Sequence, residues 1–212
     1  MATQQSEYPV RYSVDYPDRN LNRLTTAFRI FVAIPVLIVL GAVSGNTYVS
    51  TYSSTGSRVV VTGAGGLLFL APLLMILFRR KYPRWWFDWN LELQRFTNRV
   101  LLYVLLMDDR YPSTDAQQSL QLEYVYPDAS RELNRWLPLV KWFLAIPHYI
   151  VLTFLWIAVF FVDIAAWIAI LFTGRFPKGM FDFVEGVLRW GQRVVAYSLT
   201  LVTDRYPPFS LR

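Results

Sequence analysis

The chain alternates between long apolar runs and short polar, charged segments. The first apolar run covers residues 24–43, and the second covers 59–78, where it stops against Arg79-Arg80-Lys81. Each run has about the 20 apolar residues that a helix needs to cross a hydrocarbon core of about 30 Å. The pattern therefore predicts two membrane-spanning helices in the first half, joined by a Ser-, Thr- and Gly-rich loop over 44–57.

The second half contains one longer apolar stretch, over residues 136–172. As a single helix it would be about 55 Å long, which is too long for one untilted crossing. We therefore expect a tight hairpin that turns near residues 152–160. The predicted fold is mainly α: an integral membrane protein with four transmembrane helices arranged as two hairpins.

Each predicted hairpin is followed by a segment with apolar residues at helical spacing and arginines between them. These segments, residues 85–107 and 178–202, are typical of amphipathic helices that lie in the membrane interface. Short alternating stretches precede the hairpins, with Val10, Tyr12 and Val14 in one and Leu120, Leu122 and Tyr124 in the other. They predict two short β-strands, which pair either with each other or with the Asp-Arg-Tyr-Pro segments further along the chain.

The same short motifs occur twice and in the same order, which predicts a tandem repeat. The two units are expected at residues 8–114 and 119–212, packed as one compact membrane unit. The recurring motifs are Tyr16-Pro17-Asp18 and Tyr126-Pro127-Asp128, Leu21-Asn22-Arg23 and Leu133-Asn134-Arg135, Ala33-Ile34-Pro35 and Ala145-Ile146-Pro147, and Asp109-Arg110-Tyr111-Pro112 and Asp204-Arg205-Tyr206-Pro207.

Composition and charge support a membrane protein. Hydrophobic residues make up 54% of the chain and charged residues only 17%, against about a quarter in soluble domains. The net charge is +6, but the basic residues flank the apolar runs and residues 44–57 carry no charge. This positive-inside distribution favours lipid over nucleic acid as the partner, and it predicts cytoplasmic termini and a cytoplasmic segment over 79–135.

Several of these basic residues are candidates for contact with lipid headgroups. They are Arg79, Arg80, Lys81, Arg99, Arg175, Lys178 and Arg193.

Chemistry-bearing residues are few. The chain has no cysteine and a single histidine, so a thiolate nucleophile, a sulfur-ligated metal and a His-dependent serine hydrolase are all disfavoured. The glycines at 63–66 have no strand before them and no Lys-Ser/Thr after them, so a phosphate loop is not supported. We therefore predict no enzyme activity, no metal site and no cofactor.

Three polar residues within the apolar stretch of the second half form a candidate intramembrane site: Lys141, His148 and Asp163. An acid among apolar residues is costly in a bilayer. In a hairpin centred near Leu152, Lys141 and Asp163 would lie at similar depth and form an ion pair. Such a pair either fixes the register of the hairpin or belongs to a proton relay or ion site. His148 also has two interpretations, a packing residue or a ligand.

The motifs Phe172-Thr173-Gly174-Arg175-Phe176-Pro177, Phe181-Asp182-Phe183 and Asp204-Arg205-Tyr206-Pro207 carry a resemblance. The second half resembles the bacterial membrane family catalogued as domain of unknown function 4389. The first half resembles a divergent second copy, with Arg79-Arg80-Lys81 in place of Thr173-Gly174-Arg175. The resemblance implies a multi-pass protein of a bacterial inner membrane and supplies no activity.

Two classes of function are compatible with these sequence features. The first is a non-catalytic accessory or structural subunit of a larger membrane protein complex, which contacts lipid and partner subunits. The second is a small transporter, channel or lipid-handling protein that uses Lys141, His148 and Asp163. A polar interior would favour the second class, and a dry apolar interior would favour the first.

Overall fold

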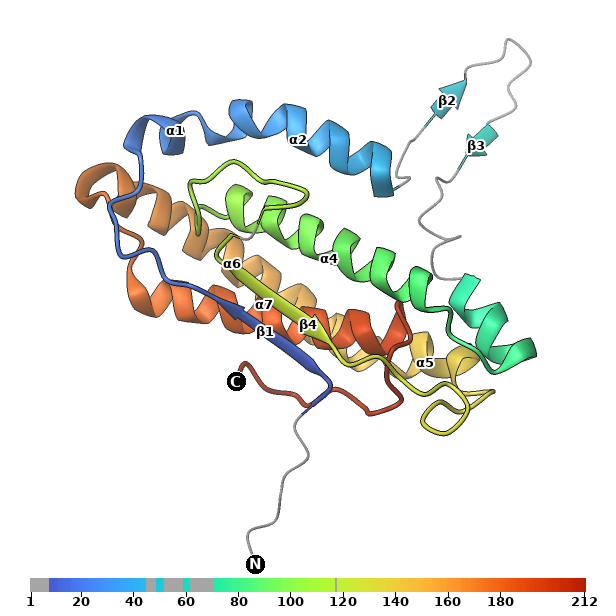
Figure 1. Ribbon diagram of the computed structural model, residues 1–212. Helices are drawn as coiled ribbons and strands as arrows, with labels where there is room; N and C mark the ends of the chain where they lie inside the picture. The colour runs from blue at the N-terminus through green and yellow to red at the C-terminus, as the bar shows by residue number, and fades with distance from the viewer. Residues whose placement is uncertain (1–7, 45–48, 52–58, 62–70, 117) are drawn as a thin grey trace, which may run out of the picture.

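The computed structural model describes residues 8–44, 49–51, 59–61, 71–116 and 118–212, which fold into a mainly helical structure (Figure 1). The elements in chain order are β1 (Val10–Val14), α1 (Arg23–Ala27), α2 (Arg29–Ser44), β2 (Val49–Thr51), β3 (Val59–Val61), η1 (Met75–Arg79), α4 (Arg84–Val104), β4 (Leu120–Tyr124), α5 (Pro138–Leu144), α6 (Ile146–Thr173) and α7 (Lys178–Ser198).

Strands β1 and β4 pair with each other in an antiparallel ladder with Tyr12 opposite Leu122. Burial alternates along both strands, because one face packs on the core and the other faces outward. This confirms the first of the two predicted pairings. Strands β2 and β3 form a second antiparallel pair, in the region where the sequence predicts a loop and the start of a helix.

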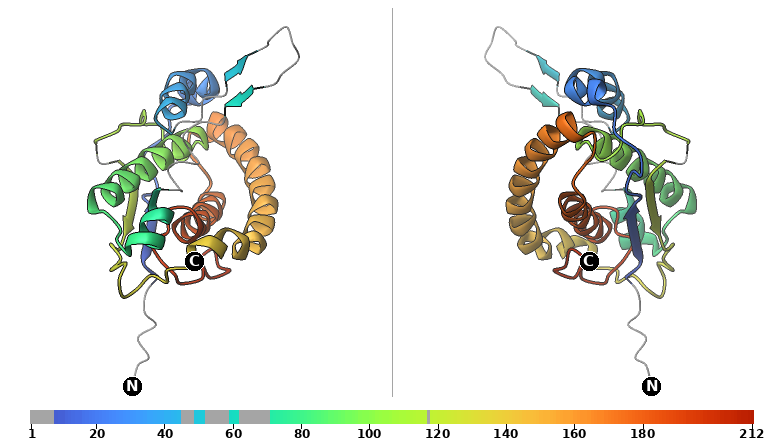
Figure 2. Two further views of the ribbon diagram at one scale, coloured as in Figure 1. Left: turned by 90° about the vertical axis from the view of Figure 1, so that its right-hand side faces the viewer. Right: turned by 90° about the vertical axis from the view of Figure 1, so that its left-hand side faces the viewer.

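Helix α7 forms the centre of the molecule. It packs against β1 on one side, and α6 curves around it on another (Figure 2). Its apolar face includes Phe181, Val187 and Tyr197, all almost fully buried. Helix α4 also buries one face and packs against α2 and β4. Both helices therefore occur close to the predicted ranges, but their apolar faces bury in the protein core rather than in a membrane interface.

The prediction of four membrane-spanning helices is wrong. Among the described residues, one helix, α6, is long and apolar enough to cross a membrane, judged by length and composition alone. The run over 24–43 divides at Phe28 into α1 and α2. The 16 residues of α2 span only about 24 Å at 1.5 Å per residue, so α2 is shorter than a hydrocarbon core.

The second predicted span, over 59–78, lies partly outside the described residues. Its start forms β3 rather than a helix, and its end is helical over 71–74 and continues into the π-helix η1. The glycines of the run, residues 63–66, also lie outside the described residues.

The predicted hairpin over 136–172 is also wrong, because α6 continues through residues 152–160 without a turn. No proline or glycine follows Pro147 until Gly174. Pro147 lies in the first turn of α6, where its missing N–H is tolerated. Gly174 adopts φ 77° and ends the helix in the left-handed conformation that glycine accepts. The stretch divides instead at Ala145, between α5 and α6.

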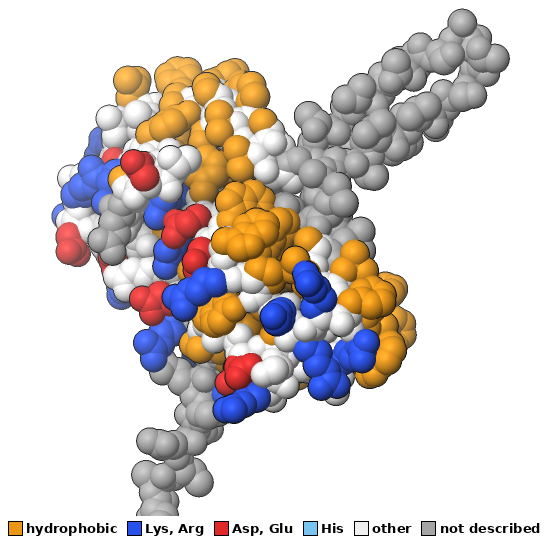
Figure 3. All heavy atoms as spheres, turned by 45° about the vertical axis from the view of Figure 1, so that its right-hand side comes forward, with side chains coloured by type: hydrophobic (Ala, Val, Ile, Leu, Met, Phe, Trp, Pro, Cys, Tyr) orange, Lys and Arg blue, Asp and Glu red, His pale blue; other side chains and the backbone are white. Residues whose placement is uncertain are grey.

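Large apolar side chains cover the outer surface of α1–α2 and of α5–α6. Figure 3 shows apolar side chains gathered over much of one face, with Lys and Arg side chains at its edge. A patch of this extent on a folded chain marks an interaction with lipid or with another protein. Its most exposed members are Leu24, Ile30, Phe31 and Ile38 on α1–α2, and Trp136, Phe143, Phe154, Phe160, Phe161 and Phe172 on or beside α5–α6.

Candidate functional site

Lys141 on α5 is fully buried and binds the C-terminal segment. Its Nζ lies 2.7 Å from Asp204 Oδ1 and donates a hydrogen bond of 2.7 Å to the carbonyl of Thr203. The ammonium also lies 5.1 Å from the centre of the Tyr197 ring. The expected partner, Asp163, is therefore replaced by Asp204. Because a buried charge is tolerated only with such partners, this ion pair fixes α5 to the segment after α7.

Arg29 is a second buried cation, at the start of α2, and only 3% of it is exposed. Its Nη1 donates to the carbonyl of Asp108 at 3.1 Å, and its guanidinium carbon lies 4.1 Å from the centre of the Tyr103 ring. The next residue, Asp109, forms an ion pair with Arg19 rather than with Arg29. Among the described residues, Nε and Nη2 of Arg29 have no hydrogen-bond partner.

Asp163 and Arg29 line the same cavity, of about 430 Å³, between α1–α2 and α6. The buried Oδ1 of Asp163 has no hydrogen-bond partner among the described residues. The remaining lining is mostly apolar and includes Ile30, Phe160 and Trp167. Two oppositely charged residues, each with a buried polar atom that lacks a partner among the described residues, thus line one largely apolar cavity.

His148 is a core residue at the start of α6 and is fully buried. Its ring stacks on Phe209 with centroids 4.0 Å apart, and Tyr206 lies beside it. Trp190 Nε1 donates to His148 Nδ1 at 3.1 Å. A neutral ring that accepts at Nδ1 carries its proton on Nε2. The structure therefore brings His148 together with aromatic side chains, not with Asp163 or Lys141.

Two of the predicted headgroup contacts bind the chain's own carbonyls. Arg99 is buried and donates to the carbonyls of Ser113 and Thr114. Arg193 donates to the carbonyls of Ser210 and Arg212. Both arginines hold the segment that follows their own helix, which is a structural role.

The other five predicted headgroup contacts are exposed on the surface. Arg79, Arg80 and Lys81 follow or end η1. Arg175 donates to Asn20 at 3.0 Å, and Lys178 lies 3.7 Å from Asp182. All five lie next to the ends of apolar segments, where a basic side chain meets the headgroup layer of a bilayer.

A buried carboxylate, Asp108, anchors the turn between α4 and β4. It accepts hydrogen bonds from Ser119 Oγ at 2.6 Å and from Arg110 Nη2 at 2.9 Å. Burial alone would raise the pKa of Asp108, but the hydrogen bonds from Arg110 and Ser119 outweigh it and hold that pKa below its usual range. The same contact raises the pKa of Arg110. This carboxylate is a structural anchor.

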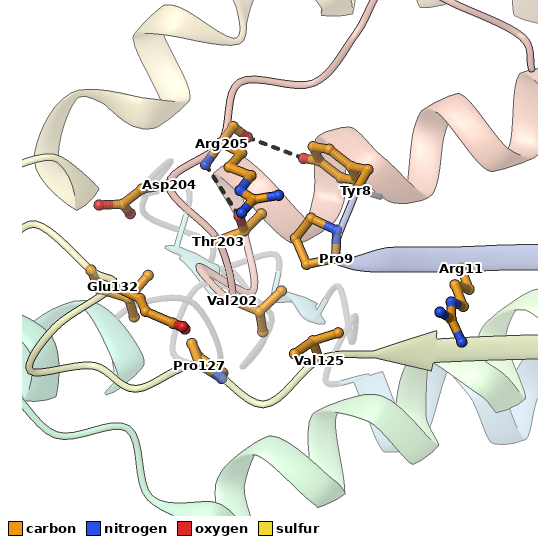
Figure 4. A pocket seen from close by; sticks show the side chains of 11 residues that line it. Tyr8, Pro9, Arg11, Val125, Pro127, Glu132, Val202, Thr203, Asp204 and Arg205 are labelled. Atoms are coloured by element: carbon orange, nitrogen blue, oxygen red, sulfur yellow. Dashed lines mark hydrogen bonds between the residues drawn. The ribbon is translucent and has the colours of Figure 1, made fainter. Parts of the chain in front are cut away.

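A polar pocket of about 500 Å³ lies between β1, the segment after β4 and the C-terminal segment (Figure 4). Its lining includes Tyr8, Glu132 and Thr203. The Tyr8 hydroxyl donates to the carbonyl of Arg205 at 3.2 Å, and the N–H of Arg205 donates to Thr203 Oγ1. These contacts shape the C-terminal segment that also carries the partner of Lys141.

Among the described residues, no three His, Cys, Asp or Glu side chains stand close enough to hold a metal ion. Sequence reasoning missed Asp204 as the partner of Lys141 and Arg29 as the neighbour of Asp163. A signal for both existed, because Asp204 lies in the recurring Asp-Arg-Tyr-Pro motif and Arg29 occupies the position of Lys141 in the first predicted unit.

The comparisons with known proteins identify one segment of the chain. No curated protein and no solved structure shows a significant match. One protein-family model matches the chain, within the second predicted unit and not the first, so two tandem copies of that family are not found. Residues 136–210 match the family described as domain of unknown function (DUF4389).

Proposed function

We propose that the chain is a non-catalytic accessory or structural membrane protein whose apolar face contacts lipid and partner subunits. The observation that carries the proposal is the uncovered surface of α6. This helix has 28 residues without a lysine or arginine, and most of its large apolar side chains are exposed. In water such a surface is unfavourable by about 25 cal/mol per Å² of apolar area, so it requires a lipid or protein cover.

The proposed orientation places the polar face in the cytoplasm of a bacterium and the apolar face in its inner membrane. Strand β1 and the C-terminal segment lie on the same side of the molecule (Figure 1). The exposed Arg79, Arg80 and Lys81 at one site and Arg175 and Lys178 at another would lie at the level of anionic headgroups.

The proposal includes two related units, and the long helix of each donates a hydrogen bond to the strand of the other. Arg95 Nε donates to the carbonyl of Leu122 at 3.0 Å, and Arg189 Nε donates to that of Tyr12 at 2.9 Å. Helices α4 and α7 each have 21 residues and begin after a proline. Tyr12 and Leu122, which hold the same place in the two strands, face each other across the β1–β4 ladder.

Extraction from native membranes tests the proposal. An accessory membrane protein stays in the pellet after alkaline carbonate treatment. After mild-detergent extraction it migrates on a sizing column with a defined complex whose subunits mass spectrometry identifies. Release by carbonate would contradict the membrane assignment, and migration as a lone chain with lipid would contradict the accessory role.

A small lipid-handling protein is the second candidate function. The observation that favours it is the cavity between α1–α2 and α6, whose mostly apolar lining includes Arg29 and Asp163.

A further inference from the structure

The cavity between α1–α2 and α6 is lined by Arg29 and Asp163, two residues of opposite charge that form no hydrogen bond or ion pair with each other in the described part of the chain. Arg29 is almost fully buried, and its Nε and Nη2 find no acceptor among the described residues. Asp163 Oδ1 is buried without a donor among the same residues. Buried polar groups normally have hydrogen-bond partners, and leaving charged groups without them is costly. Both residues line this one cavity, so a ligand bound in it would lie beside both charged side chains.

The walls of the cavity show where that ligand enters. Ile30, Phe160 and Ile164 line the cavity and are also exposed on the apolar outer face. The cavity is therefore continuous with the surface that we assign to lipid. Its volume of about 430 Å³ lies in the range of small-molecule sites. An amphiphile can place its polar head against Arg29 and Asp163 while its chains remain among the apolar side chains outside.

The pair of charges selects the headgroup. A guanidinium binds phosphate oxygens well because its N–H groups match their geometry. A carboxylate accepts hydrogen bonds and repels a second anion. The headgroup must therefore combine a phosphate with a cationic donor of N–H bonds. A choline head has no N–H to donate, and a glycerol head has no cation.

We propose that this cavity binds a zwitterionic phospholipid with a primary amine, with its phosphate on Arg29 and its ammonium on Asp163. The inference rests on the proposed contact of the apolar face with lipid. It assigns Asp163 a ligand-binding role in place of the predicted ion pair with Lys141.

The test uses the full chain, purified in mild detergent and mixed with equal amounts of phosphatidylethanolamine, phosphatidylcholine and phosphatidylglycerol. Native mass spectrometry then measures the lipids that stay bound. One charge-assisted hydrogen bond corresponds to about a tenfold preference for phosphatidylethanolamine over phosphatidylcholine. Equal retention of the three lipids, or a preference for phosphatidylglycerol, would overturn the inference.

Three variants separate the site from general effects. Asp163→Asn keeps the shape of the side chain and should bring the two zwitterionic lipids close to equal retention. Ala27→Trp fills the cavity from an exposed lining position and should lower total bound phospholipid. Glu123→Gln removes an exposed charge on β4 that pairs with Arg11, and should behave as the wild type. An unchanged lipid preference in Asp163→Asn would overturn the assignment of the ammonium site.

Carbonate extraction of the same wild-type protein separates the two proposals. A chain that stays in the membrane pellet but shows no headgroup preference overturns the lipid site alone. A chain released by carbonate overturns the membrane assignment and the lipid site together.

Discussion

Lys141 on α5 and Arg29 at the start of α2 are two buried cations, aligned with each other in the two predicted units, that differ in how they are satisfied. Lys141 has a carboxylate, a carbonyl and a tyrosine ring around its ammonium. Arg29 has a carbonyl and a tyrosine ring, but its corresponding carboxylate, Asp109, pairs with Arg19. Among the described residues, the ammonium of Lys141 has an ion-pair partner and a hydrogen-bond acceptor, whereas Nε and Nη2 of Arg29 have no acceptor.

This difference separates a structural charge from a binding charge. A fully paired ion inside a protein holds two segments together, and its removal mainly affects folding. A buried ion with open hydrogen-bonding positions depends on a further partner. The Lys141 cluster therefore joins α5 to the C-terminal segment, and Arg29 is the cation that we propose binds a headgroup beside Asp163.

The largest expected effect tests the complete cluster. Lys141→Met should destabilise the protein by about 2–3 kcal/mol, because it leaves Asp204, whose side chain is only 19% exposed, without its counter-ion. Denaturant unfolding in detergent micelles measures the free energy. Arg131→Met is the matched control, since Arg131 is exposed and should change stability by about 0.5 kcal/mol at most. A loss below about 1 kcal/mol in Lys141→Met would show that the pair is not structural.

A smaller effect is expected at His148, the other predicted site residue that the structure places in the core. His148→Phe keeps an aromatic ring against Phe209 but leaves the Trp190 N–H without an acceptor, at a cost of about 1–3 kcal/mol. Tyr149→Phe, at the next and partly exposed position, is the control. Equal stability of the two variants would contradict a packing role of His148.

The pH dependence of folding stability tests a further paired charge, the buried carboxylate of Asp108. Its folded-state pKa is lowered, so its contribution is present above the unfolded pKa of about 4 and is lost as pH falls through the folded value. Asp108→Asn should cost about 1–2 kcal/mol at pH 7 and weaken the loss of stability on acidification. Unfolding curves at pH 7 and pH 3 test this.

The control for that measurement is Asp18→Asn, at an exposed position near the same turn. It should leave both the stability at neutral pH and its acid dependence close to those of the wild type. An Asp108→Asn variant with the pH profile of the wild type would contradict the role of the carboxylate.

The sequence predicted what local pattern determines. Alternation identified β1 and β4, and helical spacing identified α4 and α7 close to their observed bounds. The prediction of the membrane-spanning helices failed because hydropathy shows that a segment is apolar but not the direction in which the segment runs. The length argument assumed that a long apolar helix runs straight across a bilayer, whereas α6 curves around α7 (Figure 2).

The candidate site was predicted only in part, for a related reason. Lys141 and Asp163 were chosen because they are charges within an apolar stretch, and a hairpin would have brought them together. Because α6 continues without a turn, Asp163 lies far along the chain from Lys141 on α5, and the charged residues near each come from distant segments. Asp204 after α7 pairs with Lys141, and Arg29 on α2 lines the same cavity as Asp163. Long-range packing of this kind is not encoded in local periodicity.

The solvent at the two faces of the molecule gives the most direct test of a lipid-facing α6. The chain has no cysteine, so spin labels at Phe154→Cys on α6 and Glu123→Cys on β4 report single sites without background. In lipid vesicles, the label at 154 should be reached by oxygen and shielded from a water-soluble nickel complex, and the label at 123 should show the reverse. Equal access of the nickel complex to both labels would contradict a lipid-facing α6.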